Sequence, residues 1–490
     1  MHYRVRSALI TITARALLGR GAALAVALFP TLALAAPPVF FGLGDLPNHS
    51  GSYPFALSSD GKVIVGDSAI GGATEAFIFT QEDGIQSLGD LPGGDLYSTA
   101  RGISPDGSVI VGWSASAKGP QQACKWKDGQ IIGLDDLDGD GFSGGALGAS
   151  AGGSIIVGVG NSDLGNEGVV WINDIPTRIG GFPEMEFATS AVVVSQDGSV
   201  IFGSWTRGSG TYRWVNGVVD DLGGSAADEG PVGVRAASAD GSVAVGEFMH
   251  GGRQEACRWE AGRAESLEPI GSLSRRSMAF GVSADGSVVV GDREGQDPDW
   301  SGPFLWDRKH GMRSLMSILQ RDFPTNVTDW ILYSGRGISA DATTIVGTGG
   351  ISGGQGGAWA VIFSDSDEDG LLDYVDNCPG VANSEQADKD SDGAGDTCDN
   401  CLDVANGPLS PDAGGHTQRD TDHDGYGNVC DADLNNDGIV NFIDLARMKA
   451  RFFSTNATAD VNGDGAVNFA DLAIMKQSFF KKPGPAAGKP

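Results

Sequence analysis

A sequence pattern that recurs seven times between residues 58 and 347 limits what this chain can fold into more than any other feature. Five copies begin Ser-x-Asp-Gly, while Gly152 replaces the Asp in the third and Ala342 replaces the Gly in the seventh; every copy continues with a short apolar run and reaches a glycine eight residues after the serine. The serines are Ser58, Ser104, Ser150, Ser195, Ser238, Ser283 and Ser339, and the glycines are Gly66, Gly112, Gly158, Gly203, Gly246, Gly291 and Gly347. The spacing is 43 to 46 residues, with 56 before the last copy. Such a period is typical of repeat folds, in which each unit packs against its neighbours.

Each repeat is predicted to form strands. Asp-Gly between apolar runs favours a hairpin, because glycine accepts a positive φ without strain. An aromatic residue follows in every copy: Phe79, Trp126, Trp171, Trp214, Trp259, Trp306 and Trp359. A leucine-bearing strand is expected near Leu88, Leu134, Ile179, Leu222, Leu267 and Leu315. About four strands in roughly 45 residues is the size of one propeller blade.

The last repeat lacks its leucine-bearing strand, and a matching segment, Phe41–Pro47, stands before the first repeat. The N-terminal strand would therefore complete the last blade and close the ring, which removes exposed strand edges. The sequence predicts an all-β main domain over residues 36–363, a seven-bladed β-propeller closed by this strand. An open β-solenoid is the alternative.

These units resemble the HAF family of extracellular repeats over about residues 39–363. The shared elements are Gly-Leu-Gly-Asp-Leu, Ser-x-Asp-Gly-x-x-x-Val-Gly and Glu-Ala-Phe-x-Trp, the last present here at 75–79 and 255–259. The resemblance implies an extracellular location and a shape, but no activity.

The repeats contain no recognisable catalytic constellation. Residues 148–152 match the G-x-S-x-G nucleophile elbow, yet Ser150 is in register with the other repeat serines and is expected to be structural. The repeated aspartates are expected to brace turns: Asp60, Asp106, Asp197, Asp240, Asp285 and Asp341. Cys124 and Cys257 are expected to be buried and unpaired. The sequence therefore predicts a protein that is not an enzyme.

Export is predicted from residues 1–35. Arginines precede a short apolar run, and Ala33-Leu34-Ala35 matches a signal-peptidase site, with cleavage after Ala35. No other segment is apolar enough to span a membrane. The net charge of -30 disfavours nucleic acid and anionic membrane as partners. Residues 365–480 hold 24 acidic and 6 basic side chains, so this stretch needs cations to fold.

Acidic side chains alternate with other residues before a glycine in residues 365–432. Such spacing lets carboxylates converge on a hard cation while glycine makes the sharp turn. The predicted ligands are Asp365, Asp367, Asp369, Asp373, Asp376, Asp388, Asp390, Asp392, Asp396, Asp420, Asp422 and Asp424. The stretch resembles thrombospondin type 3 repeats, which implies bound calcium and the disulfides Cys378–Cys398 and Cys401–Cys430. Four cysteines alone allow three pairings.

Two further loops, 27 residues apart, end the chain. Their residues at positions 1, 3, 5, 7, 9 and 12 are Asp433, Asn435, Asp437, Ile439, Asn441 and Asp444, then Asp460, Asn462, Asp464, Ala466, Asn468 and Asp471. Position 7 would donate its backbone carbonyl. A short helix follows each loop, with Leu445, Met448 and Phe452 and then Leu472, Met475 and Phe479 on the buried faces.

Residues 433–481 resemble an EF-hand-like type I dockerin, which implies calcium and a cohesin-like protein partner. Positions 10 and 11, often small and polar in that family, are Phe442-Ile443 and Phe469-Ala470 here. Residues 482–490 are expected to be a disordered tail.

The combined prediction is a secreted, calcium-binding, non-catalytic binding or adhesion protein. Its propeller would present a polysaccharide or surface ligand site, and its calcium region would be a spacer and docking module. The alternatives are a dockerin-borne extracellular enzyme that acts on polysaccharide and a surface or matrix component with no ligand of its own.

Overall fold

The structure is a computed structural model that describes residues 39–137, 143–163, 165–180, 188–205, 210–223, 229–269, 274–295, 301–322, 327–351 and 356–488. The predicted signal peptide, residues 1–35, lies outside the described residues. Among the helices in the described ranges, none has the length and apolarity to cross a membrane.

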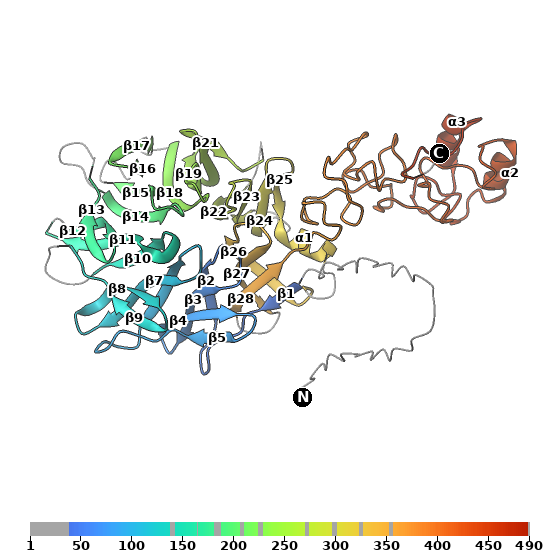
Figure 1. Cartoon of the computed structure of the whole chain (residues 1–490). Coiled ribbons are helices and arrows are strands. Elements are labelled where there is room, and N and C mark those ends of the chain that lie inside the picture. The colour runs from blue at the N-terminus through green and yellow to red at the C-terminus, as the bar shows by residue number, and fades with distance from the viewer. Residues whose placement is uncertain are drawn as a thin grey trace, which may run out of the picture. The chain divides into compact units, whose positions relative to one another are not determined.

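The main domain is all-β and consists of four-stranded antiparallel sheets (Figure 1). Consecutive strands form each of the first four sheets: β2 (Ser52–Leu57), β3 (Ile64–Ile70), β4 (Ala73–Thr80) and β5 (Gly84–Ser87); β6 (Ser98–Ile103), β7 (Val109–Ser116), β8 (Gly119–Lys127) and β9 (Gln130–Gly133); β10 (Gly145–Ala149), β11 (Ile155–Ser162), β12 (Gly165–Ile172) and β13 (Ile175–Arg178); β14 (Ala188–Val194), β15 (Val200–Trp205), β16 (Thr211–Val215) and β17 (Val218–Gly223).

The next two four-stranded groups are joined by one parallel bridge between Gln254 and Arg276. They contain β18 (Glu229–Ala237), β19 (Val243–His250), β20 (Arg253–Glu260) and β21 (Arg263–Ser266), then β22 (Arg276–Val282), β23 (Val288–Glu294), β24 (Gly302–Asp307) and β25 (Gly311–Ser314). The last group contains β26 (Trp330–Ile338), β27 (Thr344–Ile351), β28 (Gly356–Ile362) and β1 (Val39–Gly42).

The N-terminal strand completes the last sheet, as the sequence predicts. β1 pairs antiparallel with β28, with Phe40 opposite Val361 (Figure 1). The strand covers Val39–Gly42 rather than Phe41–Pro47. Leu43 and Leu46 follow the strand and are buried in the core between the last and first sheets.

The repeat serine is a structural residue in every copy described. The Ser58 hydroxyl donates to Asp60 at 2.7 Å and accepts the Val63 amide at 3.0 Å. Ser150, buried at 1% exposure, accepts the Ile155 amide in the same way, which supports a scaffold role over a nucleophile. The hydrogen bond from Ser195 and those from Ser199 lower the pKa of Asp197 to about 2, because they favour its charged form.

Backbone hydrogen bonds link the turns of successive repeats through the residue after each serine. The N–H to carbonyl pairs, each 2.9 Å, are Ser59 to Pro105, Ala151 to Gln196, Gln196 to Ala239, Ala239 to Ala284, Ala284 to Ala340 and Ala340 to Ser59. A bond from residue 105 to residue 151 cannot form, because proline has no N–H. The last repeat is thus bonded directly to the first.

The glycine eight residues after each serine is required by a close backbone approach. If residue 112 carried a Cβ, that atom would be much closer than 3.0 Å to the Thr99 carbonyl oxygen. The same close approach to a backbone carbonyl oxygen occurs at Gly66, Gly158, Gly203, Gly246, Gly291 and Gly347. No other residue fits there without moving the strand, which explains why the glycine recurs.

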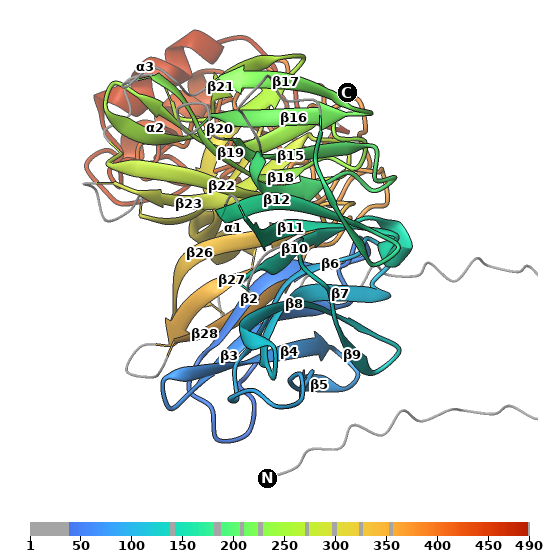
Figure 2. The same cartoon turned by 90° about the vertical axis from the view of Figure 1, so that its left-hand side faces the viewer.

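Hydrophobic cores lie between neighbouring sheets, which sit side by side in Figure 2. Trp126 packs with residues of the first and second sheets, and Trp171 with residues of the second and third. Phe77 of β4 and Ala358 of β28 share a core, so the last sheet also packs on the first. Cys124 and Cys257 are buried and unpaired, as predicted.

Of the six leucine-bearing strands, β17 contains its predicted Leu222, and the other five end earlier than expected. β5, β9, β13, β21 and β25 each stop at the residue before the predicted leucine or isoleucine. Leu134 and Leu267 then donate their amides to Ala123 and Ala256 at 2.8 and 2.9 Å, and both side chains are buried. Leu315 instead begins a helix, α1 (Leu315–Asp322), which the sequence reasoning missed.

The C-terminal region is mostly irregular chain with two short helices, α2 (Phe442–Ala450) and α3 (Phe469–Ser478). Its first loop joins the β domain through Tyr374, whose hydroxyl donates to the Ala342 carbonyl at 3.2 Å. Tyr374 is buried in the same core as Trp359 and Phe363.

Candidate metal centres

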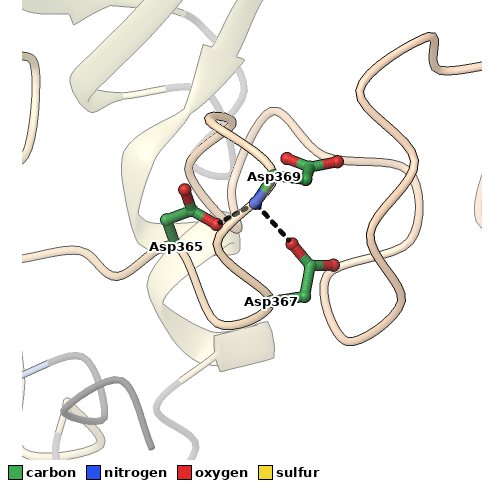
Figure 3. Close-up of side chains that lie close together, drawn as sticks. All are labelled: Asp365, Asp367 and Asp369. Carbon is green, nitrogen blue, oxygen red and sulfur yellow. Dashed lines mark hydrogen bonds between the residues drawn. The ribbon is translucent and has the colours of Figure 1, made fainter. Parts of the chain in front are cut away.

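The first acidic loop gathers three carboxylates around one point. Ligand atoms of Asp365, Asp367 and Asp369 lie within 4.8 Å of one another (Figure 3). The Asp369 amide donates to both Asp365 and Asp367 at 3.2 Å, which turns these side chains inward. Gly370 makes the turn with φ of 95°. Oxygens bound to one Ca²⁺ at about 2.4 Å lie at most about 4.8 Å apart, so the spacing suits calcium.

The same arrangement recurs in the two following loops, at Asp388, Asp390 and Asp392 and at Asp420, Asp422 and Asp424. Burial, followed by the charges of Asp392 and Asp399, raises the pKa of Asp390 to about 6. Both carboxylate oxygens of Asp390 and one of Asp367 are buried without a hydrogen-bond partner. Buried oxygens that lack partners are costly unless a cation fills the gap, so the residues present fit a bound Ca²⁺.

Two of the other predicted ligands brace the start of a loop. Asp373 and Asp396 accept the amides of Ser366 and Lys389, each at 2.8 Å. Asn428 accepts the Thr421 amide in the same manner, at 2.8 Å. Because the neutral Asn428 accepts the same hydrogen bond from a backbone amide, this bond does not require a charged side chain. A calcium-ligand role for Asp373 and Asp396 stays a prediction.

Asp376 stands beside the first triad. Asp399 and Asp431 are the equivalent residues beside the second and third triads, and the sequence analysis did not predict them as ligands. Asp376 accepts the Cys378 amide at 2.8 Å, Asp399 accepts the Cys401 amide at 2.8 Å, and Asp431 accepts the Asp433 amide at 2.8 Å. Burial, then the charges of Asp424, Asp422 and Asp433, raises the pKa of Asp431 to about 8. The repeated Asp-Asn-Cys at 376–378 and 399–401 was the signal for Asp399.

The predicted disulfides are both present, as Cys378–Cys398 and Cys401–Cys430. Cys378, Cys401 and Cys430 are buried, in a region with few apolar side chains around them. The bridges therefore replace part of the missing core as a source of stability.

The two terminal loops place their predicted ligands at the start of each helix. Position 12 of each loop, Asp444 and Asp471, is fully buried and caps its helix together with Asn441 or Asn468. Single oxygens of Asn435, Asp444 and Asp460 are buried without a partner. The loop at 460–471 also holds Asn462, Asp464 and Ala466, and the loop at 433–444 holds Asp437 and Ile439.

The backbone carbonyls predicted as ligands are engaged by a side chain. The Ile439 carbonyl accepts from the Asn441 amide group at 3.1 Å, and the Ala466 carbonyl accepts from Asn468 at 2.9 Å. Within the described chain, the acidic triads are confined to the first three loops, because the triads use positions 1, 3 and 5 and Asn replaces Asp at position 3 in the two terminal loops.

The two helices bury one face each, as predicted. Met448 and Met475 are fully buried in one core, with Leu445, Phe452, Leu472 and Phe479 packed around them. Positions 10 stay on the surface: Phe442 and Phe469 are 68% and 70% exposed. Each belongs to an aromatic group related by the 27-residue repeat, Phe442 with Phe479 and Phe480 and Phe469 with Phe452.

The chain end differs from the expected disordered tail. The Pro485 carbonyl accepts the Leu402 amide at 2.9 Å, and the Ala487 amide donates to the backbone carbonyl of Asp399 at 2.7 Å. Ala486 is 2% exposed. Leu402 follows Cys401 where Pro379 follows Cys378 in the preceding copy, and only a non-proline residue supplies the N–H that holds the tail.

Disulfides and Asp-rich loops define a C-terminal region of calcium-binding modules of the kind found outside cells. The family model of the dockerin type I domain matches residues 420–480, and that of the thrombospondin type 3 repeat matches residues 364–386. The dockerin match begins at 420 rather than at the predicted 433, so it includes the third acidic triad. A sequence search of curated proteins finds no match.

Solved structures similar to the chain include β-propeller proteins. An oligogalacturonate lyase in complex with manganese is 11% identical, covers 67% of this chain and 97% of its own, and has a TM-score of 0.42. The oligogalacturonate lyase of Vibrio parahaemolyticus is 12% identical, covers 67% of this chain and 98% of its own, and has a TM-score of 0.42. The Myceliophteria thermophila Cps50 (Swd1) β-propeller domain is 9% identical, covers 66% of this chain and 99% of its own, and has a TM-score of 0.38. At these TM-scores the likeness is distant.

Proposed function

We propose that this chain is a secreted, calcium-binding, non-catalytic protein that binds an extracellular ligand through its β domain and attaches through its C-terminal region. The carrying observation is the set of three acidic triads, of which the first two contain buried oxygens, on Asp367 and Asp390, that lack a hydrogen-bond partner. Calcium at these loops would neutralise carboxylates that otherwise repel one another. The predicted ligands of the two terminal loops extend the same chemistry into the dockerin-like segment.

The β domain is proposed to be a closed, seven-bladed propeller of the HAF type. Three observations support closure: β1 completes the last sheet, the Ala340 amide bonds to the Ser59 carbonyl, and Phe77 shares a core with Ala358. A closed ring leaves no sheet edge for aggregation and holds the loops at its ends in a fixed arrangement. Such a head suits ligand presentation outside the cell.

Attachment is proposed to occur through the dockerin-like segment. Dockerin domains bind cohesins, and the match at 420–480 supports a cohesin-like partner. Phe442, Ile443 and Phe469 are exposed and would replace the polar contacts expected at positions 10 and 11. A pull-down from a secretome, with and without calcium, tests this: the partner should be captured only with calcium and lost on Phe442→Asp with Phe469→Asp.

An extracellular enzyme that acts on polysaccharide is the second candidate, because dockerin modules commonly accompany such enzymes. The full chain, loaded with calcium, should be screened against a polysaccharide panel for both binding and product release. Binding without turnover supports the non-catalytic proposal. Turnover would replace it with the second candidate.

A further inference from the structure

The first strand of every sheet contributes to one cavity in the β domain, and the residue three positions before each repeat serine faces it. The cavity has a volume of about 250 Å³. The seven residues at this position all line it: Phe55, Arg101, Leu147, Val192, Arg235, Phe280 and Arg336. They come from repeats far apart in sequence, so only the fold brings three arginines together.

The lining of this cavity is basic in a strongly acidic chain. Among the described residues that line it, three are arginines and none is Asp or Glu. The chain as a whole carries a net charge of -30. Burial lowers the pKa of Arg101; the charge of Asp67 opposes this lowering, and the charges of Arg336 and Arg235 add to it. Three like charges held this close to one another repel, which calls for a negative partner.

Protein carboxylates meet that need only in part. Arg235 makes a paired contact with Glu247, at 3.1 Å from Nε and 2.8 Å from an Nη atom. Asp67 and Asp292 lie near Arg101 and Arg336 but accept hydrogen bonds from Thr99 and Ser334. Within the described residues, no carboxylate comes within 4.0 Å of the Arg101 or Arg336 guanidinium.

Aromatic rings hold the two remaining guanidiniums by their faces. The Arg101 guanidinium carbon lies 4.0 Å from the centroid of Phe55, and that of Arg336 lies 4.4 Å from Phe280. A cation–π contact of this kind leaves guanidinium N–H groups able to donate hydrogen bonds to another partner. Each guanidinium carries five such donors in a fork that fits carboxylate, sulfate or phosphate oxygens.

We propose that this cavity binds a small ligand that carries a carboxylate or another oxyanion, held by Arg101, Arg336 and Arg235, with Phe55 and Phe280 against its apolar surface. A cavity volume of about 250 Å³ suits a small molecule or the acidic end of a larger one. This site names the ligand class of the proposed binding head and rests on that proposal.

The test is calorimetric titration of the calcium-loaded full chain with sodium glucuronate, glucose and sodium sulfate. Glucuronate and glucose share a ring and differ by a carboxylate in place of a hydroxymethyl group. Glucuronate should bind, sulfate should compete with it, and glucose should bind at least about tenfold more weakly. Arg101→Gln and Arg336→Gln should each weaken glucuronate binding by about tenfold or more.

Arg213→Gln is the matched control, because Arg213 lies on β16 outside the cavity and pairs with Asp220. Arg101→Lys keeps the charge but loses the fork, so it should fall between the wild type and Arg101→Gln. Unchanged thermal unfolding of the variants would show that they fold.

Equal binding of glucose and glucuronate, no binding at a Kd of about 1 mM or tighter, or equal behaviour of the cavity and control variants would overturn the oxyanion site. If the chain still bound a neutral polysaccharide, the proposed binding function would stand without it.

Discussion

Replacing one triad aspartate should change the stability of its loop in opposite directions with and without calcium. Asp390 stands in a triad whose ligand atoms lie within 4.8 Å of one another, and both its oxygens lack hydrogen-bond partners. At that distance two carboxylates repel by about 0.9 kcal/mol in bulk water and about 3.5 kcal/mol at an effective dielectric constant of ~20. Asp390→Asn removes two of the three repulsive carboxylate pairs among Asp388, Asp390 and Asp392.

Without calcium, Asp390→Asn should therefore stabilise the loop by at least about 2 kcal/mol, since the water-like limit is a lower bound for a triad in which Asp392 and the Asp390 oxygens are buried. With calcium, the lost ligand should weaken binding by about tenfold or more, which is ~1.4 kcal/mol of stabilisation for each tenfold. Hydrogen exchange of the peptide around 388–401 measures both effects. Exchange should slow in EDTA and quicken in calcium relative to wild type.

Asp403→Asn is the control, because Asp403 is exposed in the same region, belongs to no triad and pairs only with Lys389 at 2.6 Å among the described residues. If Asp390→Asn quickened exchange in EDTA, or if both variants behaved alike in calcium, the triad would not be a cation site and the reasoning would fail.

Three further changes test other parts of the structure. Gly112→Ala should destabilise the β domain by about 1–3 kcal/mol or more in urea unfolding, because its Cβ would meet the Thr99 carbonyl; a variant as stable as wild type would refute the close approach. Serine at both Cys401 and Cys430, whose sequence separation is 29, should cost about 3.6 kcal/mol by chain entropy, seen as faster exchange of residues 401–430; unchanged exchange would mean that the bridge is dispensable. Burial raises the pKa of Asp67 from 3.8 to about 6, so its contribution to stability is present below about pH 4 and lost as the pH rises through 6. Asp67→Asn should remove that loss, so its free energy of unfolding in urea should rise relative to that of the wild type by up to about 3 kcal/mol between pH 4 and pH 7. A difference between the two proteins that stays constant over this pH range would contradict the raised pKa of Asp67.

The regular parts of the fold could be predicted from the sequence because they repeat. The Ser-x-Asp-Gly turn, the distant glycine and the blade aromatic each recur, and the strand at β1 follows from what the last repeat lacks. Helix α1 was missed because Leu315 continues the register of the leucine-bearing strands, and that register alone does not show the chain turning into a helix.

The acidic triads were predicted because their ligands alternate along a short stretch of sequence, whereas Asp399 and Asp431 stand outside that pattern and come near Asp392 and Asp424 only in the folded chain. The arginine cavity was invisible for a similar reason. Arg101, Arg235 and Arg336 occupy one repeat position in only three copies, and an isolated arginine on a strand indicates an exposed edge rather than a site. The packed tail depends on the Leu402 amide, which only the folded chain brings near Pro485.

The central claim is that calcium and disulfides, rather than an apolar core, hold residues 365–480 together. Limited proteolysis of the full, oxidised chain in calcium and in EDTA tests it most directly, with the fragments mapped by mass spectrometry. Calcium should protect the whole chain from residue 39 onward, and EDTA should open cleavage sites within 365–480 while the β domain stays intact. Equal resistance of residues 365–480 in calcium and in EDTA would contradict the claim.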